Sequence, residues 1–163
     1  MPCFIEVFSL QEVGEVLCSR HKCADVTYLV SIGEPHEELP AGYESVQRRL
    51  RLHFADTVAG ELSPTKEDVQ RIIELAETLR SSSGRILVHC AAGISRSSAA
   101  ALIMHAVWLG PGRERDALER VLAQRPVARP NRRMVELADE LLGRDGELVE
   151  VLGQLPPLPV IGW

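Results

Sequence analysis

One ten-residue run, Val-His-Cys-Ala-Ala-Gly-Ile-Ser-Arg-Ser at positions 88–97, constrains the fold of this chain more than any other feature. The apolar residues 86–88 lead into the run, and an alanine-rich helical pattern follows it. The sequence therefore predicts a strand, a tight loop and the start of a helix. In that arrangement, the backbone N–H groups of the loop and of the helix N-terminus can bind an oxyanion.

The run places Cys90 at the start of the loop and Arg96 at its end. N–H donors and a nearby arginine favour the thiolate form of a cysteine, which is its nucleophilic form. The planar guanidinium of Arg96 can meet two phosphate oxygens, whereas a lysine cannot. Gly93 lets the backbone turn tightly and approach a ligand closely. We therefore predict that Cys90 attacks the phosphorus atom of a phosphate bound in this loop.

Two neighbours of these residues have predicted supporting roles. Ser97 can donate a hydrogen bond to the Cys90 sulfur and stabilise the thiolate as a leaving group. His89 is expected to point away from the ligand and to brace the loop through its ring nitrogens. The remaining loop residues, together with the arginine, are expected to bind the phosphate: Ala91, Ala92, Gly93, Ile94, Ser95 and Arg96.

The pattern His-Cys, five residues, Arg-Ser resembles the signature of the cysteine-dependent protein tyrosine phosphatase superfamily, most closely its compact dual-specificity branch. The resemblance is sharp over residues 50–108, and the rest of the chain fits it in layout alone. It implies a protein tyrosine or dual-specificity phosphatase, a hydrolase that forms a phosphocysteine intermediate on Cys90. No cofactor or metal is expected, because the nucleophile, the acid and the anion clamp are all protein groups.

The resemblance also implies a general acid just after a strand that precedes the cysteine. Residues 50–54 fit that strand, and Asp56 is therefore the candidate acid, which then acts as base on the attacking water. Glu61 and Asp68 are the alternatives, although Asp68 also suits the first turn of a helix. His53 alternates with apolar neighbours and is expected to lie on a strand face.

Other functions remain open for a loop of this kind. The chain could bind a phosphoprotein without turnover, although such modules usually lack the Cys or the Asp that are both present here. It could also be a small-molecule phosphatase or a sulfur- or arsenate-handling enzyme. The loop carries no lysine, which disfavours phosphoinositide substrates. The predicted partner is a phosphorylated protein or a small phosphomonoester, and the sequence does not choose between phosphotyrosine, phosphoserine or phosphothreonine and a metabolite.

Composition and charge limit the number of domains and the kinds of partner that this chain can have. With 163 residues, 45% of them hydrophobic and 25% charged, the chain is predicted to form one globular domain, 1–163, with residues 155–163 as an extended tail. The net charge of −5 disfavours nucleic-acid binding. No membrane span or signal peptide is visible, so we expect a cytoplasmic protein with no membrane partner. The excess of arginine over lysine is typical of a GC-rich bacterial genome, and the oligomeric state stays open.

The other cysteines are Cys3, Cys18 and Cys23. In a reducing cytosol we expect free thiols rather than a disulfide framework. The Cys18–Cys23 segment, with one histidine, lacks the four well-spaced ligands of a zinc site. Any of the three thiols could rescue an oxidised Cys90 as a disulfide, and the sequence does not say which.

Strand patterns alternate with helical ones, which predicts an α/β fold with a small, mostly parallel central sheet flanked by helices. The ligand is expected at the carboxyl end of the central strand. The predicted strands are 4–8, 26–31, 46–54 and 85–89, and the arginines of the third indicate an exposed side or edge. The predicted helices are 9–18, 63–81, 97–108, 113–124 and 131–142. Ser9 is expected to cap the first of these helices, and Ser63-Pro64 is expected to open the second.

The basic segment 125–133 precedes the last of these helices. Arg129 or Arg132 could guide an anionic substrate. Asn131 could contact the substrate or cap the helix, and we favour a solvated basic turn in which Asn131 is the N-cap.

Overall fold

The computed structural model of this chain describes residues 3–158. Four strands form one sheet in the order β1-β4-β2-β3, and each neighbouring pair is parallel. The strands are β1 (Phe4–Phe8), β2 (Val26–Gly33), β3 (Arg49–His53) and β4 (Arg85–His89). The predicted α/β fold with a small parallel sheet is confirmed, and the arginine-rich strand β3 lies at the edge of the sheet.

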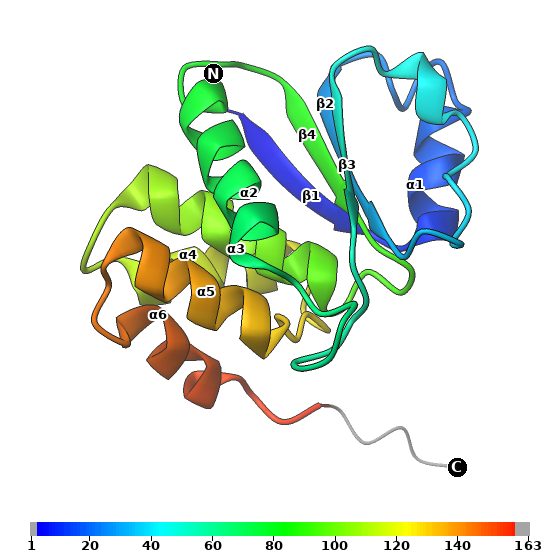
Figure 1. Cartoon of the computed structure of the whole chain (residues 1–163). Coiled ribbons are helices and arrows are strands. Elements are labelled where there is room, and N and C mark those ends of the chain that lie inside the picture. The colour runs from blue at the N-terminus through cyan, green and yellow to red at the C-terminus, as the bar shows by residue number, and fades with distance from the viewer. Residues whose placement is uncertain (1–2, 159–163) are drawn as a thin grey trace.

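Helices cover both faces of the sheet (Figure 1). Helix α1 (Leu10–Leu17) lies on one face, and the other helices lie on the opposite one: α2 (Lys66–Leu79), α3 (Arg96–Leu109), α4 (Glu114–Gln124) and α5 (Arg132–Leu142). The side chains of β4 alternate accordingly. Ile86 and Val88 belong to the large hydrophobic core against α2–α5, and Leu87 belongs to the smaller one against α1.

The central strand and the central helix position the loop between them. Strand β4 pairs with β1 on one side and with β2 on the other. Helix α3 is buried along almost its whole length, which explains why most of its residues are apolar and no polar face is apparent. The segment that joins them, residues 90–95, therefore leaves the sheet at its carboxyl end, where the sequence predicted the ligand.

The second helix begins later than predicted. Thr65, not Ser63, is the N-cap of α2, because the Thr65 hydroxyl accepts from Asp68 N while the Asp68 carboxylate accepts from Thr65 N. Ser63 instead donates to the Gly60 carbonyl in the preceding turn. The helix also ends at Leu79 rather than near residue 81. The first helix agrees better with prediction, since Ser9 and Glu12 form its capping box.

The C-terminal segment holds structure that the sequence analysis missed. A short helix, α6 (Glu147–Glu150), and a 3-10 turn, Val151–Gln154, follow α5. Both are too short for a recognisable periodicity, and α6 is held by a tertiary contact. The buried Asp139 carboxylate accepts from the N–H groups of Gly146, Leu148 and Val149. Of the predicted tail, residues 155–158 have no regular structure and residues 159–163 lie outside the described part.

No helix within residues 3–158 has the length and apolar character needed to cross a bilayer.

Candidate active site

The loop that follows β4 turns its carbonyl groups outward. Every carbonyl from Ala91 to Ser95 accepts a hydrogen bond, in chain order from Leu10 N (3.0 Å), Arg125 Nη2 (3.3 Å), Arg125 Nε (3.0 Å), Arg129 N (2.7 Å) and Asn131 N (3.1 Å). By contrast, none of the N–H groups from Ala91 to Ser95 donates to an acceptor within residues 3–158. Five successive donors are therefore available to an anion, as in other concave backbone sites.

A glycine is required at the middle of this loop. Gly93 has φ +69°, and a Cβ atom there would lie 2.6 Å from both the carbonyl carbon of Phe8 and the nitrogen of Ser9. Both the backbone conformation and the close approach of β1 exclude a side chain.

The N-terminus of α3 is also open to a ligand. Its N-cap, Ser95, makes no capping hydrogen bond with its side chain. The Ser95 hydroxyl donates instead to Asp56 Oδ1, at 2.5 Å. The first turn of this long helix keeps its N–H groups and its partial positive charge for an anion.

Arg96 is held on one side and unpartnered on the other. Its side chain is 6% exposed, and its Nη1 donates to the Phe54 carbonyl at 2.9 Å and to Glu37 Oε1 at 3.2 Å. Its Nε is buried and has no hydrogen-bond partner among the described residues. Buried donors are nearly always satisfied, so this edge is suited to a ligand oxygen. A phosphate that meets Nε and Nη2 would form a bidentate pair.

Cys90 and Ser97 lie together beneath the loop. The Sγ and Oγ atoms are 3.1 Å apart, and both residues are buried. The structure therefore brings the predicted thiol within hydrogen-bonding distance of the predicted hydroxyl.

His89 braces the loop through a buried chain of hydrogen bonds. Burial lowers the pKa of His89 to about 4, so the ring is neutral near pH 7. Its Nδ1 lies 3.1 Å from the Cys90 carbonyl, which can only accept, so Nδ1 carries the proton. Nε2 then accepts from Ser31 Oγ at 2.6 Å, and Ser31 accepts from Arg51 Nη1 at 2.8 Å. The sequence analysis missed Ser31 and Arg51, although a serine inside an apolar strand signals a buried partner.

Asp56 faces the loop from the segment after β3. Its Oδ1 accepts from Ser95 Oγ and, at 2.8 Å, from Asn131 Nδ2. Asn131 also caps α5, since its Oδ1 accepts from Met134 N. The predicted helix cap is thus confirmed, and the same side chain holds Asp56. Because Oδ1 accepts twice, a proton on this carboxyl group would sit on Oδ2.

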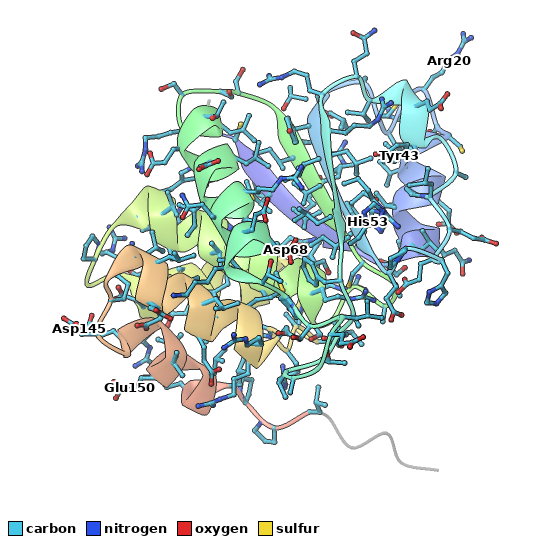
Figure 2. All side chains as sticks on the ribbon, viewed as in Figure 1. Arg20, Tyr43, His53, Asp68, Asp145 and Glu150 are labelled. Atoms are coloured by element: carbon cyan, nitrogen blue, oxygen red, sulfur yellow. The ribbon has the colours of Figure 1, made fainter. Side chains whose placement is uncertain are left out.

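The alternatives to Asp56 as general acid, Asp68 and Glu61, lie away from the loop, and so does His53. Asp68 caps the first turn of α2, and His53 is exposed on β3, where it contacts Arg51; both are labelled in Figure 2. Glu61 is exposed in the turn before α2. None of the three forms a hydrogen bond with the described loop residues.

Arg125 was not singled out by the sequence. It donates to the Ala92 and Gly93 carbonyls and pairs with both carboxylate oxygens of Glu12, at 2.7 and 2.9 Å. The hydrogen bonds from Arg125 lower the pKa of Glu12 to about 2. The Arg129 side chain instead donates to the Ala128 and Pro156 carbonyls, and that of Arg132 pairs with Glu136. Nothing in the sequence distinguishes the first arginine of this basic segment from the others.

Glu37 is a second residue that the sequence did not distinguish. It lies in an acidic loop after β2 beside two other glutamates, Glu34 and Glu38, and only its contact with Arg96 distinguishes it from them.

All four cysteines are free thiols. Residues 3–158 contain no group of three or more His, Cys, Asp or Glu side chains arranged to hold a metal ion.

Comparison with known proteins identifies dual specificity phosphatases as relatives. No protein-family model matches the chain. The human dual specificity protein phosphatase 15 is 35% identical over 130 residues, which cover 78% of this chain and 38% of that protein. The crystal structure of DUSP15 superposes with a TM-score of 0.59 and 27% identity, over 87% of this chain and 88% of that one. Tk-PTP shares the fold, with a TM-score of 0.63, 24% identity and coverage of 88% and 93%.

The chain belongs to the cysteine-dependent protein tyrosine phosphatase superfamily, in its compact dual-specificity branch. It spans less than half the length of the curated relatives that it matches.

Replacing Arg125 should weaken oxyanion binding. In Arg125→Ala, two loop carbonyls lose their outward donors, and the N–H groups that face the ligand lose their orientation. We expect the Kd for inorganic phosphate to rise on the order of tenfold, measured by calorimetry. Arg129→Ala is the matched control, because only its backbone N–H contacts the loop. Equal phosphate affinity in Arg125→Ala and wild type would contradict this role.

Two buried histidines should make stability depend on pH. The pKa values of His89 and His105 are both lowered by burial from 6.5 to about 4. Between these values the unfolded chain binds more protons than the folded one, so stability falls as the pH falls. From pH 7 to pH 5, we expect each histidine to reduce the free energy of unfolding by about 2 kcal/mol, measured with urea. Glu12 contributes only below this window, since its pKa is lowered from 4.5.

A His105→Gln variant should lose about half of that pH dependence. His53→Gln, at an exposed position, should keep all of it. A stability that is flat between pH 7 and pH 5 in the wild type would show that both rings accept protons freely in the folded state.

Proposed function

We propose that this protein hydrolyses phosphomonoesters on tyrosine or on serine and threonine side chains, by way of a phosphocysteine intermediate on Cys90. The observation that supports this most is the loop around Cys90, in which five carbonyls are bonded outward and five N–H groups remain for the phosphate. The dual-specificity phosphatases among its relatives support the same reaction.

In the first step, the Cys90 thiolate attacks phosphorus. An S–P bond forms as the bond from phosphorus to the substrate oxygen breaks. Asp56 gives its proton to the departing oxygen, so the leaving group is a neutral alcohol or phenol. The equatorial oxygens stay anionic, and the loop N–H groups and the free edge of Arg96 already point to them.

In the second step, water attacks the phosphocysteine. Asp56, now a carboxylate, takes a proton from the water, and the S–P bond breaks to release inorganic phosphate. The sulfur leaves as a thiolate, and the Ser97 hydroxyl at 3.1 Å stabilises it by donating a hydrogen bond. All atoms and charges return to their starting state without a cofactor.

Cys90→Ser should abolish turnover while retaining oxyanion binding. Serine is a far poorer nucleophile here, but the loop N–H groups and Arg96 are unchanged. We expect p-nitrophenyl phosphate hydrolysis to fall on the order of 10⁴-fold, with a phosphate Kd near that of the wild type. Cys18→Ser is the matched control at an exposed position. Near wild-type rates in Cys90→Ser would exclude Cys90 as the nucleophile.

Asp56→Asn should slow the hydrolysis of substrates with poor leaving groups most. An amide cannot donate the proton, so we expect the turnover of phenyl phosphate to fall by about 10²-fold or more, and that of p-nitrophenyl phosphate by less. Glu61→Gln, which alters a rival carboxylate, should leave both substrates unaffected. Equal losses for the two leaving groups in Asp56→Asn would assign the acid role elsewhere.

A substrate panel tests the proposed class. Phosphopeptides carrying phosphotyrosine, phosphoserine or phosphothreonine should give higher kcat/KM values than nucleotides or phospholipids. Preference for a nucleotide would indicate a small-molecule phosphatase. Peptide binding without any turnover in the wild type would indicate a recognition module, and activity on thiosulfate or arsenate would indicate the sulfur- or arsenate-handling alternative.

A further inference from the structure

A pocket of about 580 Å³ lies between β1 and the C-terminal parts of α3 and α4. It shares no lining residue with the Cys90 loop. Its walls are mainly apolar and include Ile5 from β1, Trp108 and Leu109 from α3, and Ala123 from α4. This volume and this lining are typical of sites for small organic ligands.

His105 lines this apolar pocket. The residue is 8% exposed, and its ring packs edge-on against Trp108, with centroids 5.8 Å apart. Its Nδ1 is buried and has no hydrogen-bond partner among the described residues. The imidazole forms no hydrogen bond within residues 3–158, so a polar ligand atom in the pocket would lie beside an unpaired polar ring.

The charges around the pocket are positive. Arg80 and Arg120 line it, and no acidic side chain does. Arg80 is already engaged, since it pairs with Glu77 and donates to the carbonyls of Val107 and Trp108. Arg120 forms no ion pair or hydrogen bond within residues 3–158, so its charge remains available at the pocket mouth.

From these contacts we infer that the pocket binds a small amphipathic carboxylate, whose apolar chain packs against Ile5, Trp108 and Leu109. Its carboxylate lies near the His105 ring and pairs with Arg120. This site is independent of the proposed phosphatase reaction, and a failure of either proposal leaves the other standing.

Decanoate is a suitable probe. Vanadate is kept at saturating concentration so that the Cys90 loop cannot bind the carboxylate. We expect calorimetry to give a Kd on the order of 0.1–1 mM for the wild type. Arg120→Gln should weaken binding about threefold to fivefold, as expected for one exposed ion pair. Arg115→Gln, the same change elsewhere on α4, should have no effect. Ala123→Phe, which adds volume at an exposed position on the lining, should abolish binding.

The partly buried thiol of Cys3 gives a second readout that needs no variant. Cys3 lines the pocket, whereas Cys18 is exposed at the C-cap of α1. Decanoate should slow alkylation of Cys3, resolved by peptide mass spectrometry, and leave Cys18 unaffected. The inference is overturned if decanoate fails to bind, if Ala123→Phe binds it as well as the wild type, or if Cys3 is not protected. Equal affinity for decyltrimethylammonium would overturn the assignment of an anionic ligand.

Discussion

The outward hydrogen bonding of five successive carbonyls is the constraint on which the rest of the site depends. A peptide unit that presents the carbonyl of one residue to the protein presents the N–H of the next residue to the opposite side. The donors that hold these carbonyls come from the start of α1, the end of α4 and the segment before α5. Elements that lie far apart in the chain are therefore brought together at one loop, and the fold acts as its support.

The two arginines at the loop have different tasks because their carboxylate partners differ. Arg125 pairs with both oxygens of Glu12, which leaves it to orient the loop as a hydrogen-bond donor. Arg96 is held by Glu37 and Phe54 at Nη1 alone, and its Nε stays unpartnered among the described residues. The Nε edge of Arg96 is thus left free to donate to a ligand oxygen.

The sequence predicted the parts of this molecule that local pattern determines. The strand, loop and helix around Cys90 follow from an apolar run, a glycine and a nearly all-apolar helix, and the structure places Ser97 and Asp56 at the loop as expected. The N-cap of α2 was predicted at Ser63 and lies two residues later, at Thr65, because Ser63-Pro64 is an equally good local signal. Glu37, Arg51 and Arg125 act through contacts between distant segments, and no periodicity or motif marks them. Glu12 is marked by its capping box with Ser9, but nothing in the sequence marks it as the partner of Arg125.

The central claim is that this loop binds a phosphate directly above the Cys90 sulfur. Iodoacetamide alkylation at one fixed pH, resolved for each cysteine with and without inorganic phosphate, tests the claim most directly, with exposed Cys18 as the internal reference. The account predicts that phosphate slows the alkylation of Cys90 alone. If phosphate leaves the alkylation of Cys90 unchanged, or slows that of Cys18 equally, the account is contradicted.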